Sequence, residues 1–440
     1  MTSRTRRKVW LLRAGVVAAA TLCVTAAQAQ TGTTTAQAVM ALGASSTEAA
    51  ASPLNLRQVF DAAWARQPEA LALQARRDAA RAQQGAAKAW TPEPAALELS
   101  NLTDRLGKNQ GAREMEVGIA VPLWLPGERG RSAALAEAEG AAIESRATAA
   151  QLRVAAAVRD AWWQWQRARI EVGTARDQLD NSRLIAADVA RRAKAGDLAR
   201  ADQHQADSAV ASAEAGLAQA EAGLAAARQH LRALAGATPA ATASSGVAET
   251  LAEPDPGAAA TELEAHAALQ ELKDRATVAE RTVALTATQP RTNPELTLST
   301  TRDRGARGES SQQTVTLAIR IPFGAGPSFD ARSANARAEA TEVQAQLGLE
   351  RERLNAEREA ARVRVEASRA QLAASERRAQ LARESRGFFD KSFRLGETDL
   401  PTRLRIEAEA AEADRQAART RIELSAAISA WRQALGLLPQ

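Results

Sequence analysis

The chain has no tyrosine, a single cysteine and three histidines in 440 residues, and aromatic residues make up only 3% of it. Cys23 lies in the N-terminal segment, so the rest of the chain has no thiol nucleophile and no disulfide framework. The histidines, at 204, 230 and 266, lack the close spacing of zinc-binding motifs. No nucleophile–base set and no glycine-rich phosphate loop is recognisable. We therefore expect neither an enzyme nor a protein that holds a metal or another cofactor.

An excess of one charge is also lacking once the N-terminus is set aside. The net charge is +5, but residues 1–29 contain five basic residues and no acidic one, which leaves 52 of each sign. Nucleic-acid binding needs clustered positive charge, so we do not expect it. Beyond residue 29 no stretch approaches about 18 uncharged apolar residues, so any membrane insertion would not use helices.

Residues 1–29 have the pattern of an export signal peptide. A basic start and a short apolar stretch precede Ala27-Gln28-Ala29, which matches an A-x-A cleavage site. An uncleaved anchor helix is the alternative, although the apolar stretch is short for a membrane span. Lipidation at Cys23 is disfavoured because Leu22 stands where such signals have a small residue. Residues 30–52, rich in Thr, Ala and Ser, are expected to be disordered.

The rest of the chain is an internal repeat with an offset of about 200 residues. The run Val117-Gly118-Ile119-Ala120-Val121-Pro122-Leu123 is echoed by Leu317-Ala318-Ile319-Arg320-Ile321-Pro322-Phe323. Likewise, Gly196-Asp197-Leu198 is echoed by Gly396-Glu397-Thr398-Asp399-Leu400. The predicted parts are a first repeat at 53–236, a linker rich in Ala, Thr, Ser, Pro and Gly at 237–260, and a second repeat at 261–438.

Each repeat is predicted to contain a helix, a strand pair and a long helical hairpin. The strand pairs fall at 95–124 and 295–323. The hairpins fall at 128–235 and 327–436, where Ala and Leu recur every three or four residues among charges. The first helix of each hairpin would have up to about 65 residues and a length of about 100 Å, too long for a compact globule.

The strands have apolar residues at every second position. This alternation runs from Met115 to Leu123 and from Val315 to Phe323, a length that can cross a bilayer when tilted. Four strands cannot close a transmembrane barrel, which needs about eight, and an open sheet edge is not viable in lipid. Several chains would therefore share one barrel, and three would supply about twelve strands. The alternative is two ordinary soluble hairpins packed on the helices.

This duplicated arrangement resembles the TolC family of outer-membrane efflux channels. Pro122 and Pro322, which end the second strands, and the turns at Gly196 and Gly396 match that family. The resemblance implies a mainly α-helical fold with a small transmembrane β part. It implies a homotrimer with a 12-stranded β-barrel in the outer membrane of a Gram-negative bacterium and an α-helical tunnel in the periplasm. It further implies docking on a periplasmic adaptor protein and an inner-membrane RND-type pump.

Two segments, 393–402 and 433–439, look most like the heavy-metal branch of the family, the cobalt–zinc–cadmium resistance channels. We therefore expect a passive export conduit for heavy-metal cations, with the choice of metal made by the pump. One alternative is the same channel type exporting drugs or secreted proteins. Another is a periplasmic coiled-coil adaptor or scaffold protein, although an adaptor would normally have one hairpin between split lipoyl-like strands.

The resemblance also makes the two turns the periplasmic tips of the tunnel. Glycine permits the chain reversal, and a neighbouring leucine can pack into a partner's groove. A plain interhelical turn is the alternative. The candidate residues for adaptor docking are Gly196, Asp197, Leu198, Gly396, Asp399 and Leu400.

Channels of this family often narrow their tips with rings of carboxylates. Asp202 matches such a position, whereas the corresponding places after the second turn hold Thr402 and Arg405. Arg403 or Arg405 could instead pair with Asp202 and hold the tip closed. The alternative is an ordinary solvated charge on a helix.

Aromatic residues cluster at two places. Trp90, Trp124 and Phe323 lie near the inner ends of the strands, where they suit either a membrane-interface belt or packing between sheet and helices. Trp162, Trp163 and Trp165 lie within a long helix, where packing between helices is expected.

Overall fold

The computed structural model describes residues 55–107, 110–236 and 263–439. The chain divides into two units, residues 1–51 and 52–440, and all described residues belong to the second. The predicted export signal, the segment 30–52 and the predicted linker 237–260 lie outside the described residues.

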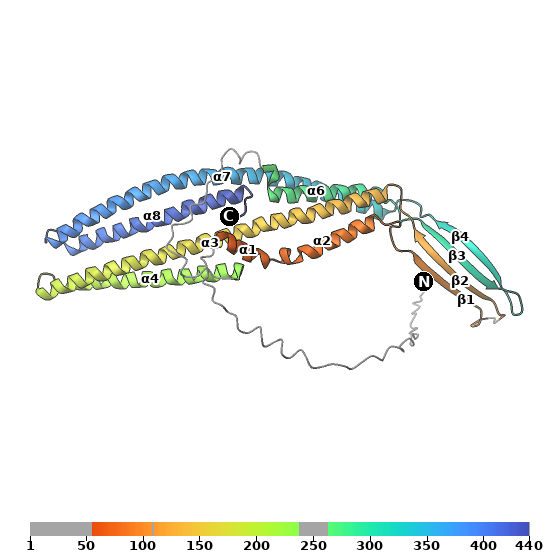
Figure 1. The fold of residues 1–440 in the computed structure, drawn as a ribbon, viewed down its shortest axis with the longest axis horizontal. Coiled ribbons are helices and arrows are strands. Elements are labelled where there is room, and N and C mark those ends of the chain that lie inside the picture. The colour runs from red at the N-terminus through yellow and green to blue at the C-terminus, as the bar shows by residue number, and fades with distance from the viewer. Residues whose placement is uncertain (1–54, 108–109, 237–262, 440) are drawn as a thin grey trace, which may run out of the picture. The chain divides into compact units, whose positions relative to one another are not determined.

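The order of elements repeats along the chain, with each strand pair followed by a long helical hairpin (Figure 1). The first set is α1 (Leu56–Ala65), α2 (Pro68–Ala87), β1 (Ala96–Thr103), β2 (Arg113–Pro122), α3 (Glu128–Ala195) and α4 (Arg200–Ala235). The second set is η1 (Leu263–Ala265), α6 (Ala267–Thr286), β3 (Glu295–Arg304), β4 (Gln312–Arg320), α7 (Pro327–Arg394) and α8 (Leu400–Ala434). The fold is thus mainly helical, with the strands at one end of α3 and α7 and the hairpin turns at the other.

The helices α3 and α7 have 68 residues each, which corresponds to about 100 Å of helix. Ion pairs three and four residues apart support the exposed parts of α7, as between Arg353 and both Glu350 and Glu357. Among the described residues, no helix combines the length and apolar character that a membrane crossing requires.

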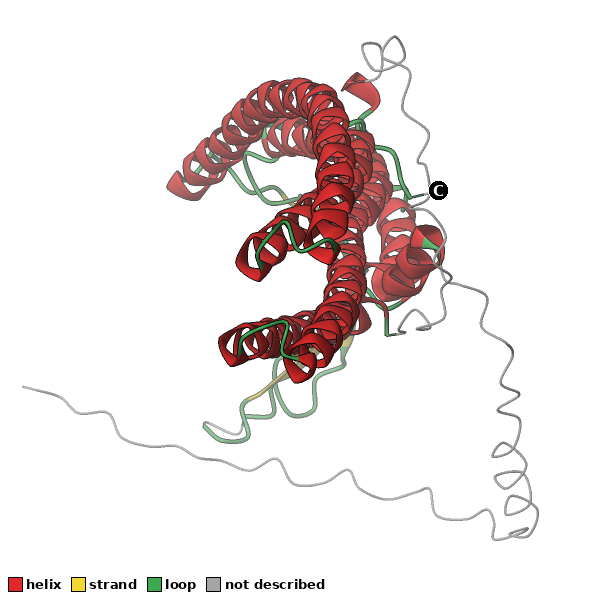
Figure 2. Ribbon diagram, turned by 90° about the vertical axis from the view of Figure 1, so that its left-hand side faces the viewer, coloured by secondary structure: helices red, strands yellow, loops and turns green. Residues whose placement is uncertain are grey.

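The hairpin helices lie in one layer, as the end-on view in Figure 2 shows. α3 packs against its own hairpin partner α4 and also against α8, and α8 in turn packs against α7. The two hairpins therefore meet along α3 and α8, while α4 and α7 form the outer edges of the layer. The short helices α2 and α6 continue this packing on α3 toward the strands.

The largest apolar cluster joins α1, α3, α4 and α8. Trp162, Trp163 and Trp165 are all buried in it, in agreement with the expected packing between helices. The rings of Trp162 and Trp165 lie 5.0 Å apart between centroids in a tilted arrangement, a geometry that aromatic pairs favour. This cluster thus packs α1, α4 and α8 together against α3.

The four strands form one antiparallel sheet in the order β1-β2-β3-β4. The pairing of β2 with β3, for example of Ile119 with Leu298, joins the two repeats. The strand pairs are therefore not the two separate hairpins of the soluble alternative. Within the described chain β1 and β4 are the edges of the sheet.

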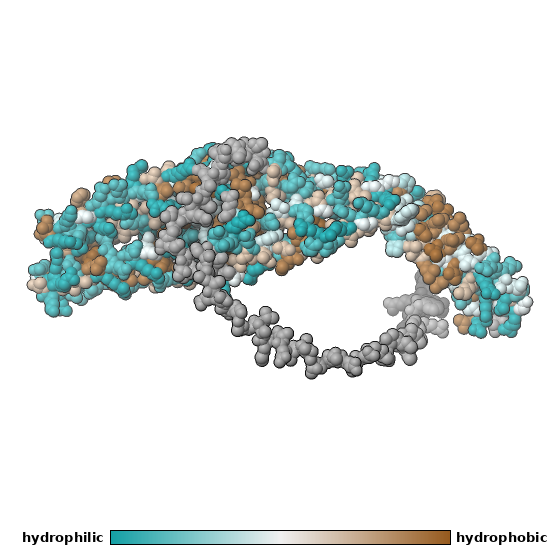
Figure 3. Space-filling view, viewed as in Figure 1, coloured by the Kyte–Doolittle hydropathy of each residue, from teal (hydrophilic) through white to brown (hydrophobic). Residues whose placement is uncertain are grey.

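The two faces of the sheet differ in chemistry. Pairing places Leu97, Ile119, Leu298 and Leu317 in one row across all four strands, and further apolar rows flank it on the same face. This face is exposed, with 70% of Leu317 accessible, and it forms the brown patch beside the helices in Figure 3. A patch of this kind normally marks a surface that something else covers.

The opposite face carries small and polar residues. Gly118 and Ser299 are buried there, and a Cβ on Gly118 would lie 3.0 Å from the Ser299 Cβ. None of the described helices packs broadly on this face. The two residues are therefore buried by neighbouring side chains of the sheet itself, as on the inner side of a curved sheet, and we call this face the concave face and the apolar face the convex face.

Candidate functional site at the hairpin tips

Both hairpin turns have the same backbone construction. Gly196 and Gly396 have φ angles of +90° and +80°, which glycine adopts without steric cost. In the first turn Gly196 N–H donates to Ala193 O at 3.2 Å and Asp197 N–H donates to Arg192 O at 3.0 Å. The second turn repeats both bonds around Gly396. These bonds satisfy the last carbonyls of α3 and α7, so the chain reverses within a few residues.

The helices that follow the turns begin with acidic caps. A carboxylate oxygen of Asp202 accepts the backbone N–H of Ala199 at 3.1 Å. A carboxylate oxygen of Asp399 accepts the backbone N–H of Thr402 at 3.3 Å. Hydrogen bonding from Thr402 holds the pKa of Asp399 below its ordinary value. Both aspartates therefore serve as local helix caps in this chain.

The expected pairing of Asp202 with Arg403 or Arg405 is not formed within the described residues. Arg405 instead pairs with Glu409, one turn along its own helix, at 2.6 Å. Arg403 instead extends into the seam between the hairpins, where Asp390 of its own hairpin and Asp188 of the other hairpin bind it. The reason is competition, since the start of α4 already engages Asp202 while two carboxylates surround Arg403.

An apolar cluster lies directly behind the turns. Ile185 and Val189 of α3 and Phe393 of α7 are buried together with Leu400, and Leu198 packs on them half-buried. Leu198 and Leu400, which follow the two turns, thus face the interior of the tip. The backbone of the turns and Asp197 and Asp399 remain exposed, and Thr402 is half-buried.

Phe393 lies between two arginines from different hairpins. The guanidinium of Arg403, on α8, lies 4.7 Å from the centre of the Phe393 ring, and that of Arg192, on α3, lies 5.0 Å from it. Only 2% of Phe393 is exposed. A cation–π contact that is shielded from water contributes up to about 2 kcal/mol. We call Asp188, Arg192, Asp390, Phe393 and Arg403 the Phe393 clasp.

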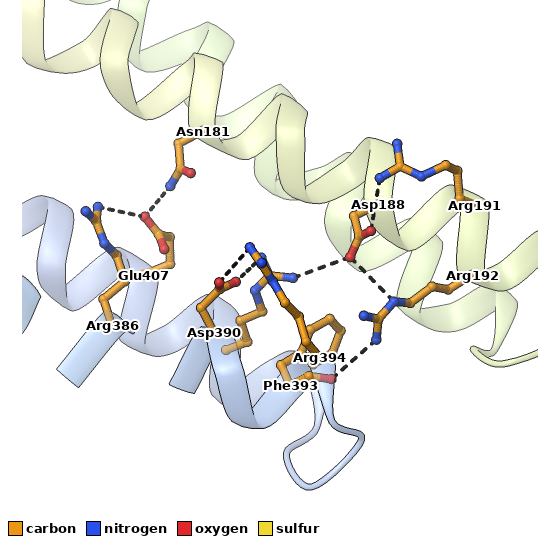
Figure 4. Close-up of polar contacts among 10 residues, drawn as sticks. Asn181, Asp188, Arg191, Arg192, Arg386, Asp390, Phe393, Arg394 and Glu407 are labelled. Atoms are coloured by element: carbon orange, nitrogen blue, oxygen red, sulfur yellow. Dashed lines mark hydrogen bonds and ion pairs between the residues drawn. The ribbon is translucent and has the colours of Figure 1, made fainter. Parts of the chain in front are cut away.

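Ion pairs complete the Phe393 clasp (Figure 4). Arg403 lies 2.8 Å from a carboxylate oxygen of Asp390 on α7 and 3.8 Å from one of Asp188 on α3. Arg192 lies 3.5 Å from Asp188 and donates to the Phe393 carbonyl oxygen at 3.3 Å. Only 12% of the Arg403 side chain is exposed. Arg403 therefore binds carboxylates of both hairpins at a site with little access to screening water.

Further polar contacts follow the same α3–α8 seam away from the turns. The side chain of Asn181 donates to Glu407, which also pairs with Arg386 at 3.4 Å (Figure 4). Arg419 pairs with Glu171 beyond them. Charged and polar side chains thus line the part of the seam between the apolar cluster behind the turns and the largest apolar cluster.

The aromatic residues at the inner ends of the strands divide into two kinds. Trp90 and Phe323 are almost fully exposed, at 94% and 91%. Trp124 is half-buried, and its indole N–H donates to the carbonyl oxygen of Ala89 at 3.2 Å. Trp124 therefore packs at the junction of sheet and helices, whereas the other two rings have no such support.

The described residues contain no group of three or more His, Cys, Asp or Glu placed to hold a metal ion. His204 and His230 are exposed on α4. His266 is buried, and its Nδ1 accepts the backbone N–H of Ala268 at the start of α6. Burial lowers the pKa of His266, and Arg358 lowers it further.

The chain is thus a duplicated unit with an exposed apolar sheet at one end and charged, clasped helical tips at the other. Residues 59–237 match the family model described as outer membrane efflux protein. This match spans most of the first repeat. Among curated proteins no sequence matches the chain.

Solved structures of outer-membrane channels share the fold over nearly all of the chain. The outer membrane protein VceC from Vibrio cholerae has a TM-score of 0.69 at 19% identity, covering 88% of this chain and 97% of VceC. CusC has a TM-score of 0.73 at 16% identity, covering 87% and 92%. The open state of MtrE from Neisseria gonorrhoeae has 0.66 at 13% identity, covering 87% and 89%. The chain therefore has the TolC-like outer-membrane channel fold.

Proposed function

We propose that the protein is the outer-membrane channel of a tripartite efflux system, a passive export conduit formed by three copies of the chain. The observation that carries the proposal is the convex apolar face of a sheet whose edge strands, β1 and β4, are open. Such a face is stable in lipid, and open edges there must pair with further strands. Three copies would supply about twelve strands and close a barrel in the outer membrane.

The helices fit the same assembly. In three copies, the outer helices α4 and α7 of neighbouring layers would meet and close a tunnel in the periplasm. The turns at Gly196 and Gly396 would be the tips that dock on a periplasmic adaptor and, through it, on an inner-membrane RND-type pump. In this proposal the exposed Asp197 and Asp399 contact the adaptor, while Leu198 and Leu400 support the turns from inside.

The Phe393 clasp is proposed as the contact that keeps each tip closed. It joins the two hairpins through Arg403, and its residues lie on the elements that would have to separate for the tip to widen. Asp202 would then act through the start of α4 rather than as part of the clasp. Transport itself would draw its energy from the pump.

For the substrate we propose heavy-metal cations, on the likeness of residues 393–402 and 433–439 to the metal-resistance branch. A conduit must bind its cargo weakly enough to release it, so the channel itself needs no metal-binding cluster. Export of drugs by the same channel type is the second candidate, since outer-membrane channels of different systems share this fold.

Two experiments test the proposal. The purified protein in a planar bilayer should form long-lived channels and should run as a trimer when cross-linked in detergent. A monomer that conducts no ions would overturn it.

Sensitivity of a deletion strain to zinc, cobalt, cadmium or copper salts, restored by the gene, would support the metal cargo. Sensitivity to dyes and antibiotics alone would replace the metal cargo by drugs.

A further inference from the structure

The loop end of the sheet carries a group of arginines without ion pairs. In the described part of the chain none of them lies within ion-pair distance of a carboxylate, whereas arginines along the helices are paired widely. We call this group the arginine end: Arg105, Arg113, Arg302, Arg304 and Arg307.

Local carboxylates do not neutralise the arginine end because they bind the backbone instead. A carboxylate oxygen of Asp104 accepts the N–H of Gly111 at 3.0 Å, and one of Glu309 accepts the N–H of Ala306 at 3.0 Å. The remaining nearby acids, Glu114 and Asp303, are paired neighbours in one row of the sheet.

The strand register decides which face each charge occupies. Arg113 is paired with Arg304, and Arg302 is paired with Met115. Successive side chains of a strand alternate between faces, so these three arginines share the convex face with Ile119 and Leu298. Glu114 and Asp303 lie on the concave face. Positive charge therefore borders the apolar rows on the convex face, and negative charge lies on the other side.

The distance between Phe323 and the arginine end fits a single crossing of a membrane's apolar layer. From Gln313, at the level of Arg302, β4 and the three residues after it reach Phe323 over at most about 34 Å, at about 3.4 Å per residue. A strand tilted by about 45° spans about 24 Å of this along the membrane normal, close to the apolar band of about 25 Å in known barrels. The exposed ring of Phe323 and the arginine end thus stand at opposite borders of the apolar face.

Two of the guanidinium groups are held in place. Arg302 donates to Ser311 Oγ from Nε and Nη2 at 3.2 and 3.1 Å. Arg304 donates to the Gly111 carbonyl oxygen at 3.4 and 3.3 Å. Arg113 and Arg302 are exposed. Neutral acceptors orient these side chains but leave their charge unbalanced, which suits an incoming anion.

We propose that the arginine end binds the phosphate groups of anionic membrane lipids whose acyl chains cover the apolar rows. Guanidinium groups bind phosphate oxygens in a two-pronged geometry. The lipid is indicated by continuity, since the arginines and the apolar rows occupy one surface. This inference rests on the proposed membrane location of the sheet.

The test uses the full-length protein in phosphatidylcholine nanodiscs that contain bis-phosphorylated lipid A, dephosphorylated lipid A or neither. Native mass spectrometry counts the lipid retained, and thermal unfolding measures the stabilisation. Lipid A should be retained in preference to its dephosphorylated form. The double variant R113Q/R302Q should lose this preference by at least about tenfold, since the loss of a single charge-assisted contact has about that effect. R320Q is the matched control, because Arg320 lies at the end of the sheet opposite the arginine end and pairs with Glu295.

Each outcome separates the two proposals. Equal retention of lipid A by R113Q/R302Q and the unchanged protein would overturn the inference, as would equal loss in R320Q. Displacement of lipid A by inorganic phosphate at similar concentration would show that the acyl chains add nothing and would overturn it too. Insertion into nanodiscs without a preference for the phosphorylated lipid would contradict this inference alone. Failure to insert under any condition would contradict the proposed function.

Discussion

Arg403 covers one side of the Phe393 ring, with its guanidinium 4.7 Å from the ring centre, although the two residues stand on opposite arms of the second hairpin. Arg192 of the first hairpin covers the ring at 5.0 Å. One buried aromatic ring thus receives cations from both hairpins. Separating the tips would expose the ring and break the ion pair of Arg403 with Asp188, whereas its pair with Asp390 lies within the second hairpin.

Replacing Phe393 by alanine should loosen both tips. The change removes a buried ring and its two cation–π contacts, and truncation of a buried phenylalanine costs about 3–5 kcal/mol. Hydrogen–deuterium exchange should rise on both sides of the α3–α8 seam. The matched control is F388A, because Phe388 lies on the same helix but is 69% exposed. Equal exchange in F393A and F388A would contradict the role of the clasp.

Replacing Arg403 should cost more than replacing Arg405, two residues away. R403Q removes the cation–π contact with Phe393 and two ion pairs, although Asp188 and Asp390 keep other arginine partners, and we expect a loss of about 2 kcal/mol. R405Q breaks an exposed pair with Glu409 and should change stability by less than about 0.5 kcal/mol. Urea unfolding of the purified protein measures both. Similar shifts for the two variants would show that Arg403 is only a surface charge.

Alanine at Gly396 should destabilise the second turn through the backbone alone. The φ angle of +80° is costly for any residue with a Cβ, by about 1–2 kcal/mol, and no atom lies within 4 Å of that Cβ. G348A in the interior of α7 also meets no atom, but there alanine should stabilise the helix by up to about 1 kcal/mol. Thermal unfolding of the pair should give opposite signs; a stabilised G396A would refute the left-handed turn.

Stability should fall as the pH drops below about 6.5, in part because of His266. Burial lowers the pKa of this histidine in the folded chain, helped by Arg358 and Arg353 and opposed by Glu350. The unfolded chain therefore binds the proton first. The contribution of neutral His266 is complete above the unfolded pKa and is lost as the pH falls through the lower, folded value.

The variant H266N retains a side chain that can cap α6 but cannot titrate. Its unfolding free energy, measured by denaturant titration across this pH range, should depend less on pH than that of the unchanged protein. H204N removes an exposed histidine from α4 and serves as the control. If H204N and H266N flatten the pH dependence equally, buried His266 has no special part in it.

Local sequence patterns predict the approximate positions of the strands and of the hairpin turns. Alternation from Met115 to Leu123 and from Val315 to Phe323 places apolar side chains on one face, and β2 and β4 overlap these stretches but begin before them. The turn glycines were recognisable because few residues tolerate a left-handed conformation. What the pattern did not reveal is that β2 pairs with β3, since that contact joins residues far apart in the sequence.

The Phe393 clasp could not be read from the sequence. Asp188 and Arg403 are separated by more than a complete hairpin, and each stands on a helix rich in both charges, where solvated side chains are the ordinary expectation. In the sequence, Phe393 stands out only as part of the segment 393–402, which resembles the metal-resistance branch. Phe388 and Phe393 stand close together in the sequence. The sequence does not show which of the two rings is buried, because this depends on how α3 meets α8.

The central claim is that the convex face of the sheet lies in lipid and the concave face in water. Because Cys23 is the only cysteine, a C23S background permits single spin labels along β4 from Gln312 to Arg320. In reconstituted protein, labels at odd positions should be accessible to oxygen, and those at even positions to a water-soluble nickel complex. Uniform access of the nickel complex to every position would contradict a sheet in the membrane.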